Sequence, residues 1–179
     1  MDANISADDG GPLAHYLIAD HERLGALLRR ALVRPHVIDR ESFADFRGGL
    51  LRHIGLEEKI LLPAAQRARD GEPLPAAARL RLDHGALAAL LVPTPTAAVV
   101  RALRAILTDH NAVEEGPEGV YAVCGRLISD EAAAVLDALR TAPPVHLAAH
   151  TDGPLVAAAT RRALVRAGYA LEDYETDDR

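Results

Sequence analysis

Cysteine and aromatic residues are scarce in this chain of 179 residues. The single cysteine, Cys124, excludes an internal disulfide and any site that requires two cysteine ligands. Aromatic residues make up 3% of the chain and tryptophan is absent, so a β-sandwich or barrel would lack its usual strand-forming residues. Alanine and leucine dominate instead, and both favour helix. The sequence therefore predicts an all-α protein.

The chain also lacks an excess of positive charge and long apolar runs. The chain has 20 Lys and Arg against 26 Asp and Glu, and its formal charge of −6 would repel a phosphate backbone, so we expect no nucleic-acid partner. No run approaches the roughly 18 apolar residues of a membrane span, and the segment MDANISADDGG lacks the apolar region of a signal peptide. No GxGxxG or P-loop motif indicates a nucleotide site. We expect a cytoplasmic protein without a membrane partner.

Proline and glycine divide the chain into segments with helical periodicity. Asp39 can cap the second helix, and Pro63 is expected to kink or shorten it. We expect residues 1–128 to form the main domain and residues 129–179 to add one or two accessory helices and an acidic tail. The expected helices cover residues 12–33, 39–69, 75–91, 96–114, 120–127, 129–140 and 154–168.

An internal repeat organises the main domain. Asp20-His21 and the leucines after it match Asp83-His84 and the leucines that follow. The motif HxxxEE then occurs twice, beginning at His53 and at His110. The chain thus contains two helical hairpins of the same design, which predicts an up-down four-helix bundle with approximate two-fold symmetry.

The repeated histidines and glutamates indicate a metal site. Residues at i and i+4 share one face of a helix, so His53 with Glu57 can direct two ligands from one helix to one centre. The second HxxxEE motif does the same, and the two preceding histidines lie on apolar stripes that face the core. Unpaired ions buried there would each cost several kcal/mol, and a metal would compensate them. The candidate ligands are His21, His53, Glu57, His84, His110 and Glu114.

This nitrogen and oxygen donor set suits iron or manganese, can accept zinc, and disfavours copper(I). Two imidazoles can hold each of two metals, with Glu57 and Glu114 as bridges, and the vacant positions can bind O₂, peroxide, NO or water. Glu58 and Glu115 point about 140° away from their histidines on an ideal helix. We therefore interpret them as solvated or as partners of the ligands, and they remain candidate substitutes for a bridging glutamate.

Three further residues near the motifs are interpreted as non-ligands. Asp20 and Asp83 directly precede a candidate histidine, and we expect them at the surface, with a role as partners of the metal ligands as the alternative. Tyr121 lies on the face of His110 but about 16 Å further along an ideal helix. We expect Tyr121 to line the core or a channel.

The order of these motifs resembles the hemerythrin-like, or HHE cation-binding, family. The likeness includes the Ile60-Leu61-Leu62-Pro63 segment after the first HxxxEE motif and spans about residues 12–128. It implies a four-helix bundle around a non-haem di-iron centre, oxo- or hydroxo-bridged, with the six candidate residues as its ligands. Oxygen carriers of the family have a further histidine where this chain has Ala88, and they end with an Asp at i+5 where this chain has Glu114 at i+4. These departures argue against simple reversible oxygen carriage.

The resemblance predicts a protein that binds, senses or turns over O₂, peroxide or NO, including peroxidase-like or catalase-like activity. Two alternatives stay open: a role in iron storage, iron donation or iron–sulfur repair, and a structural or interaction bundle without metal. The alanine-rich stripe within residues 155–165 can pack on the bundle or on a second subunit, so a homodimer also stays open.

Overall fold

The computed structural model describes residues 11–34 and 37–174, and helices dominate this part of the chain, which confirms the predicted all-α class. Short strands β1 (Leu32–Arg34) and β2 (Val37–Ile38) form an antiparallel ladder between the first two helices. Each expected helical segment is present, with ends that differ by a few residues. The helices are α1 (Gly11–Ala31), α2 (Arg40–Leu56), α3 (Leu62–Arg67), α4 (Ala77–Leu90), α5 (Ala97–Glu115), α6 (Val120–Leu127), α7 (Ala132–Thr141) and α8 (Pro154–Ala167).

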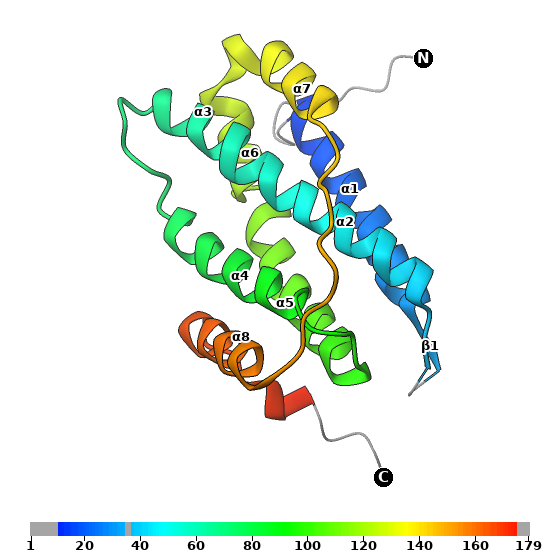
Figure 1. The fold of residues 1–179 in the computed structure, drawn as a ribbon. Helices are drawn as coiled ribbons and strands as arrows, with labels where there is room; N and C mark the ends of the chain where they lie inside the picture. Colours follow the sequence, from blue (N-terminus) through cyan, green and yellow to red (C-terminus); the bar gives the residue numbers. More distant parts are fainter. Residues whose placement is uncertain (1–10, 35–36, 175–179) are drawn as a thin grey trace.

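Helix α2 runs back along α1 after the short ladder (Figure 1). Asp39 begins it as predicted, because its side chain accepts a hydrogen bond of 2.8 Å from the backbone N–H of Ser42. Helices α4 and α5 form the second pair and contact each other. Helix α5 also contacts α1, so the two pairs lie together. These four helices carry the four histidines of the repeat, and Glu57 and Glu58 follow α2 directly.

The second helical segment does not stop at Pro63. A five-residue π-helix, η1 (Glu57–Leu61), joins α2 directly to α3. Proline has no N–H to donate, and its ring would collide with the carbonyl four residues earlier in a regular α-helix. The wider turn accommodates Pro63, and such π-segments are frequent at functional sites. Here the segment begins at Glu57, a candidate ligand.

Two apolar clusters fill the interior. The first packs residues of α1, α2, α4, α5 and α8 together and includes Leu28, Phe46, Leu87, Leu103 and Leu164. The second joins α1, α3, α6 and α7 with η1, the end of α2 and the start of α4, and it includes Leu17, Leu61, Tyr121 and Leu139. On α1, residues of the second cluster precede His21 and residues of the first cluster follow it. On α2 and α4, His53 and His84 also stand between residues of the two clusters. The histidines therefore lie between two apolar layers.

The C-terminal part of the chain packs on the other helices. Residues 142–153 cross α2 without regular secondary structure and lead to α8, which packs against α4 (Figure 1). Buried Arg47 of α2 holds this crossing by donating hydrogen bonds to the carbonyl oxygens of Leu91 (2.8 Å) and Ala148 (2.7 Å). Helix α8 thus buries Thr160, Ala163, Leu164 and Ala167 within the chain, whereas Leu155 is 86% and Val165 is 64% exposed. Among the described residues, no helix has the length and apolar character that crossing a membrane requires.

Candidate metal centre

Four histidines from four helices meet in the interior: His21 of α1, His53 of α2, His84 of α4 and His110 of α5. None is more than 7% exposed. We name His21 and His53 the His21 pair, and His84 and His110 the His84 pair. Ring centroids are 4.5 Å apart in the first pair and 4.8 Å apart in the second.

A carboxylate faces the Nδ1 atom of every one of these rings. We name these four acids, which lie around the histidines, the outer carboxylates. Because each accepts a hydrogen bond from Nδ1–H, the Nε2 atom of each ring is left to face the centre. The contacts are His21 with Glu115 (2.6 Å), His53 with Asp20 (2.9 Å), His84 with Glu58 (2.8 Å) and His110 with Asp83 (3.5 Å).

Glu57 and Glu114, the inner carboxylates, connect the two histidine pairs. The Oε1 atom of Glu57 lies 3.4 Å from Nε2 of His53, and its Oε2 atom lies 3.1 Å from Nε2 of His84. The Oε2 atom of Glu114 lies 3.5 Å from Nε2 of His21, and its Oε1 atom lies 3.2 Å from Nε2 of His110. Each inner carboxylate thus presents one oxygen to each pair.

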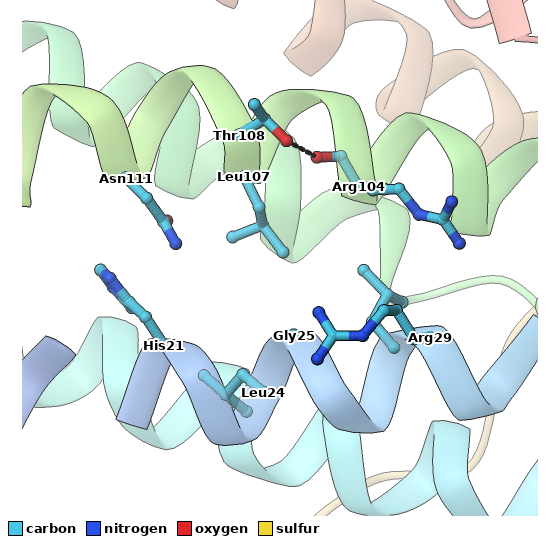
Figure 2. Close-up of a pocket in the computed structure, with 9 residues that line it drawn as sticks. His21, Leu24, Gly25, Arg29, Arg104, Leu107, Thr108 and Asn111 are labelled. Atoms are coloured by element: carbon cyan, nitrogen blue, oxygen red, sulfur yellow. Dashed lines mark hydrogen bonds between the residues drawn. The ribbon is translucent and has the colours of Figure 1, made fainter. Parts of the chain in front are cut away.

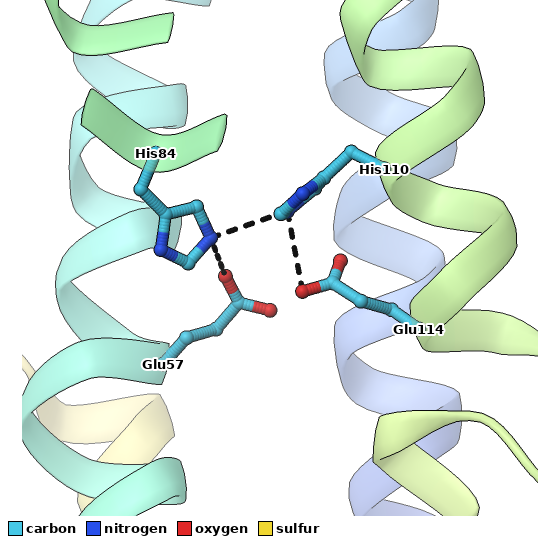
Figure 3. A group of neighbouring side chains, drawn as sticks. All are labelled: Glu57, His84, His110 and Glu114. Atoms are coloured by element: carbon cyan, nitrogen blue, oxygen red, sulfur yellow. Dashed lines mark hydrogen bonds and ion pairs between the residues drawn. The ribbon is translucent and has the colours of Figure 1, made fainter. Parts of the chain in front are cut away.

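The donor atoms around the His84 pair point toward one another (Figure 3). The Nε2 atoms of His84 and His110 are 3.2 Å apart. The buried Oε2 of Glu57 and Oε1 of Glu114 lie beside the Nε2 atoms of His84 and His110, but they accept no well-aligned hydrogen bond from any residue that the structure describes. When these imidazoles are neutral and present lone pairs, both buried oxygens lack a donor, and a bound cation would satisfy both.

The pKa values show how strongly the cluster attracts positive charge. Burial opposes the charged form of His53, but Glu57 and Asp20 outweigh it and raise the pKa to about 10. Burial likewise opposes charge on His110, while Asp83 and Glu114 raise its pKa to about 9. In the metal-free centre His53 and His110 therefore hold an extra proton at neutral pH. A metal can bind these imidazoles only after they lose that proton.

Two other groups of the centre, His21 and Glu114, titrate in the opposite sense. Burial and the neighbouring His53 lower the pKa of His21 to about 3. Burial and the charge of Glu57 raise the pKa of Glu114 above its usual value. One imidazole and one carboxyl group are thus driven toward their neutral forms by the crowding of charge in a dry site.

All six predicted ligand residues come together. The donor atoms of Glu57, His84, His110 and Glu114 lie within 4.8 Å of one another, and so do those of His21, His53 and Glu57. Both groups can hold a metal ion. The first group offers two imidazoles and two carboxylates, the second offers two imidazoles and one carboxylate, and such nitrogen and oxygen donors bind divalent transition metals.

Tyr121 is a site residue that the sequence interpretation missed. Its hydroxyl group lies 3.0 Å from Nε2 of His21 and 3.2 Å from Oε2 of Glu114, not beyond the centre along a continued helix. Helix α5 ends at Glu115, and a tight turn bonded from the N–H of Gly119 to the carbonyl of Gly116 starts α6 in a new direction. The Gly116-Pro117 pair could have indicated this position of Tyr121. It interrupts the helix, and the expected separation of about 16 Å holds only for a continuous helix.

The expected surface positions of Asp20 and Asp83 are wrong. Asp83 is buried and Asp20 is largely covered, because both lie on the sides of their helices that contact the next helix. Glu58 and Glu115 are partly exposed, and each contacts a histidine, which agrees with the expected alternatives for them. The repeat itself indicated that these four acids belong to the centre, since each half contains one Asp-His pair and one Glu-Glu pair.

A pocket of about 300 Å³ between α1 and α5 leads to the centre. Figure 2 shows His21 opposite Asn111 at one end of the pocket, with Arg29 and Arg104 at the other. Leu24 and Leu28 of α1 and Leu107 of α5 form the apolar part of its wall. The pocket offers a small ligand a route from the surface to the His21 ring.

No protein family, curated protein or solved structure matches this chain. The function is therefore inferred from the centre and its surroundings.

Proposed function

We propose that this chain is a hemerythrin-like protein, an up-down four-helix bundle that holds two non-haem irons and binds or turns over O₂, peroxide or NO. The observation that carries the proposal is the bridging by Glu57 and Glu114. Each places one oxygen beside the His21 pair and the other beside the His84 pair. Two metals at these pairs would be held at a short, fixed separation by shared carboxylates, as in two-metal sites.

The donor set favours iron over the alternatives. Structural zinc sites are closed four-ligand sites in which cysteine is the common donor, whereas neither donor group here contains a cysteine. Copper(I) prefers thiolate or thioether ligands, and the buried Cys124 does not belong to either donor group. Two irons with incomplete protein coordination would supply redox chemistry and vacant positions for a small ligand.

The rest of the centre prepares the ligands. The outer carboxylates fix the orientation of all four rings and increase the basicity of Nε2. The two apolar layers exclude bulk water, which strengthens every electrostatic interaction between the donors. The pocket beside His21 gives a diatomic molecule or peroxide access without opening the helices.

Metal analysis of the purified chain tests this proposal. After anaerobic reconstitution with ferrous iron and exposure to air, we expect about two irons per chain and a near-ultraviolet charge-transfer band that changes on addition of azide or peroxide. The double variant His53→Ala/His110→Ala should bind almost no iron. Near-zero iron in the wild-type protein would contradict the proposal and favour an interaction bundle.

Two further measurements separate the possible activities. Peroxide consumption well above that of an equal amount of free iron would show catalase-like or peroxidase-like turnover. Rapid loss of iron to a mild chelator would favour iron donation instead. Because all six donor residues are buried, we expect slow loss of iron.

A further inference from the structure

The hydroxyl oxygen of Tyr121 lies among the donor atoms of one half of the centre. It is 3.0 Å from Nε2 of His21, 3.2 Å from Nε2 of His53 and 2.5 Å from Oε1 of Glu57. The Oε2 atom of Glu114 is the fourth neighbour, at 3.2 Å. These are the four atoms that face the His21 side of the centre.

Hydrogen bonds alone do not explain this arrangement once the rings are neutral. A phenol has one hydrogen to donate, and it can satisfy only one of the four neighbours. The Nδ1–H groups of His21 and His53 are committed to Glu115 and Asp20, so each Nε2 presents a lone pair. Five electron-rich atoms then share a single hydrogen, a grouping that a cation stabilises.

We propose that Tyr121 is a fifth protein ligand of the iron at the His21 pair, bound through its phenolate oxygen. This assignment rests on the proposed di-iron function. A metal that binds an acidic side chain removes its proton, and the phenol proton is released to solvent in exchange for the bond to iron. Tyr121 is 1% exposed, and the turn before α6 fixes its approach.

The ligand makes the two metal positions unequal. The position at the His21 pair receives two imidazoles, two inner carboxylates and one phenolate, whereas the position at the His84 pair receives two imidazoles and the same two carboxylates. The first HxxxEE motif supplies no equivalent, because Ala64 stands seven residues after Glu57, where Tyr121 stands seven after Glu114. The position at the His84 pair therefore keeps one more vacancy for an exogenous ligand than the position at the His21 pair, beside which the pocket ends.

Visible spectroscopy of the iron-loaded full chain tests the assignment. A phenolate bound to ferric iron absorbs visible light through ligand-to-metal charge transfer, which imidazole and carboxylate ligands do not produce. We expect this band in the oxidised wild-type protein and its loss in Tyr121→Phe, which keeps the ring and removes only the hydroxyl group. Tyr16→Phe is the matched control, because Tyr16 is partly buried on α1 and its hydroxyl bonds the carbonyl of Leu139 outside the centre.

Resonance Raman spectra of the wild-type protein, excited in the visible band, give a readout that does not depend on any variant. Tyrosine ring modes that shift in protein grown with ring-deuterated tyrosine would support the assignment. Two irons per chain without this band, or a band that persists in Tyr121→Phe, would overturn the ligand assignment and leave the di-iron function intact. Absence of bound iron in the wild-type protein would overturn both.

Discussion

Asp20 of α1 accepts a hydrogen bond of 2.9 Å from Nδ1 of His53 on α2, across 33 positions of the chain. Arg23, one turn further along α1, pairs with the other carboxylate oxygen at 2.7 Å. Asp20 is thus held from outside while it orients a ring in the centre. The neighbouring His21 makes the same kind of contact with Glu115 of α5. Here α1 supplies the histidine, and the later helix supplies the carboxylate.

We expect Asp20→Asn to weaken iron binding about 10-fold to 100-fold, the range typical of the carboxylate partners of metal-binding histidines. The amide retains the shape of the side chain but removes the negative charge that raises the basicity of His53. Chelator competition would measure the affinity. Asp45→Asn, at an exposed position of α2, is the control and should bind iron like the wild type. Equal affinities for the two variants would contradict the expectation.

Glu114→Gln should stabilise the metal-free protein while it weakens iron binding. Burial and Glu57 raise the pKa of Glu114 above its usual value of 4.5, so the metal-free fold loses stability as pH rises through that value and the carboxylate ionises. The variant lacks this charge, and at neutral pH we expect its Tm to rise by about 2–4 °C, or roughly 1 kcal/mol for a chain of this size. Calorimetry of the metal-free proteins measures the change, and a lower Tm for the variant would count against this explanation.

Iron affinity should increase with pH. In the metal-free protein the pKa values of His53 and His110 are raised to about 10 and about 9, so both rings are protonated at neutral pH. Each bound iron must displace a proton, and we expect the affinity to rise about tenfold per pH unit from about pH 7, then to level off near pH 9 at the position that uses His110 and near pH 10 at the position that uses His53. Proton release in a weakly buffered titration measures the exchange. A flat pH profile with no proton release would show that neutral imidazoles already face the centre.

The same two shifts predict the opposite trend for folding without metal. A raised pKa stabilises the fold below the usual histidine value of about 6.5, and that contribution is lost as pH rises toward the folded-state values of about 9 and about 10. Urea unfolding of metal-free protein across this range is the measurement. Iron-loaded protein is the control and should lack this loss of stability.

Gly119→Ala should displace Tyr121 from the centre. A Cβ atom at residue 119 would lie 2.5 Å from the carbonyl oxygen of Glu114 and 2.7 Å from the backbone of Gly116, too close for the turn to persist. We expect a loss of about 1–3 kcal/mol in unfolding free energy, within the usual range for a disruptive single substitution. Gly85→Ala on α4 is the control, because nothing lies within 4 Å of its added Cβ, and it should stabilise the helix by about 0.5–1 kcal/mol. Denaturant unfolding of both variants tests the contrast.

Local periodicity was sufficient to predict the helices and the residues that meet in the centre. The i,i+4 spacing of His53 and Glu57 depends only on helix geometry, and the apolar residues around it decided which side faces inward. The Asp39 cap was equally local. These features do not depend on how the helices are arranged around one another.

Features that depend on the arrangement of separate elements were not predictable in the same way. Tyr121 reaches the centre only because a turn redirects the chain after Glu115, and helix geometry alone does not give that new direction. The burial of Asp83 depends on its contact with His110, a residue of the next helix. The π-segment at Glu57 lengthens the helix through Pro63 where the simple rule expected a kink or an end.

The outer carboxylates also constrain the symmetry of the molecule. Asp20 and Asp83 each hold a histidine of their own hairpin, whereas Glu58 and Glu115 each hold a histidine of the other hairpin. Such reciprocal contacts are those of an isologous interface, in which each copy completes the other. A single hairpin would therefore need a second copy of itself to assemble the centre, and this chain is equivalent to such a homodimer joined end to end. Within one chain the two halves need not be identical, and Tyr121 of the second half reaches the centre while Ala64 stands at the matching position of the first.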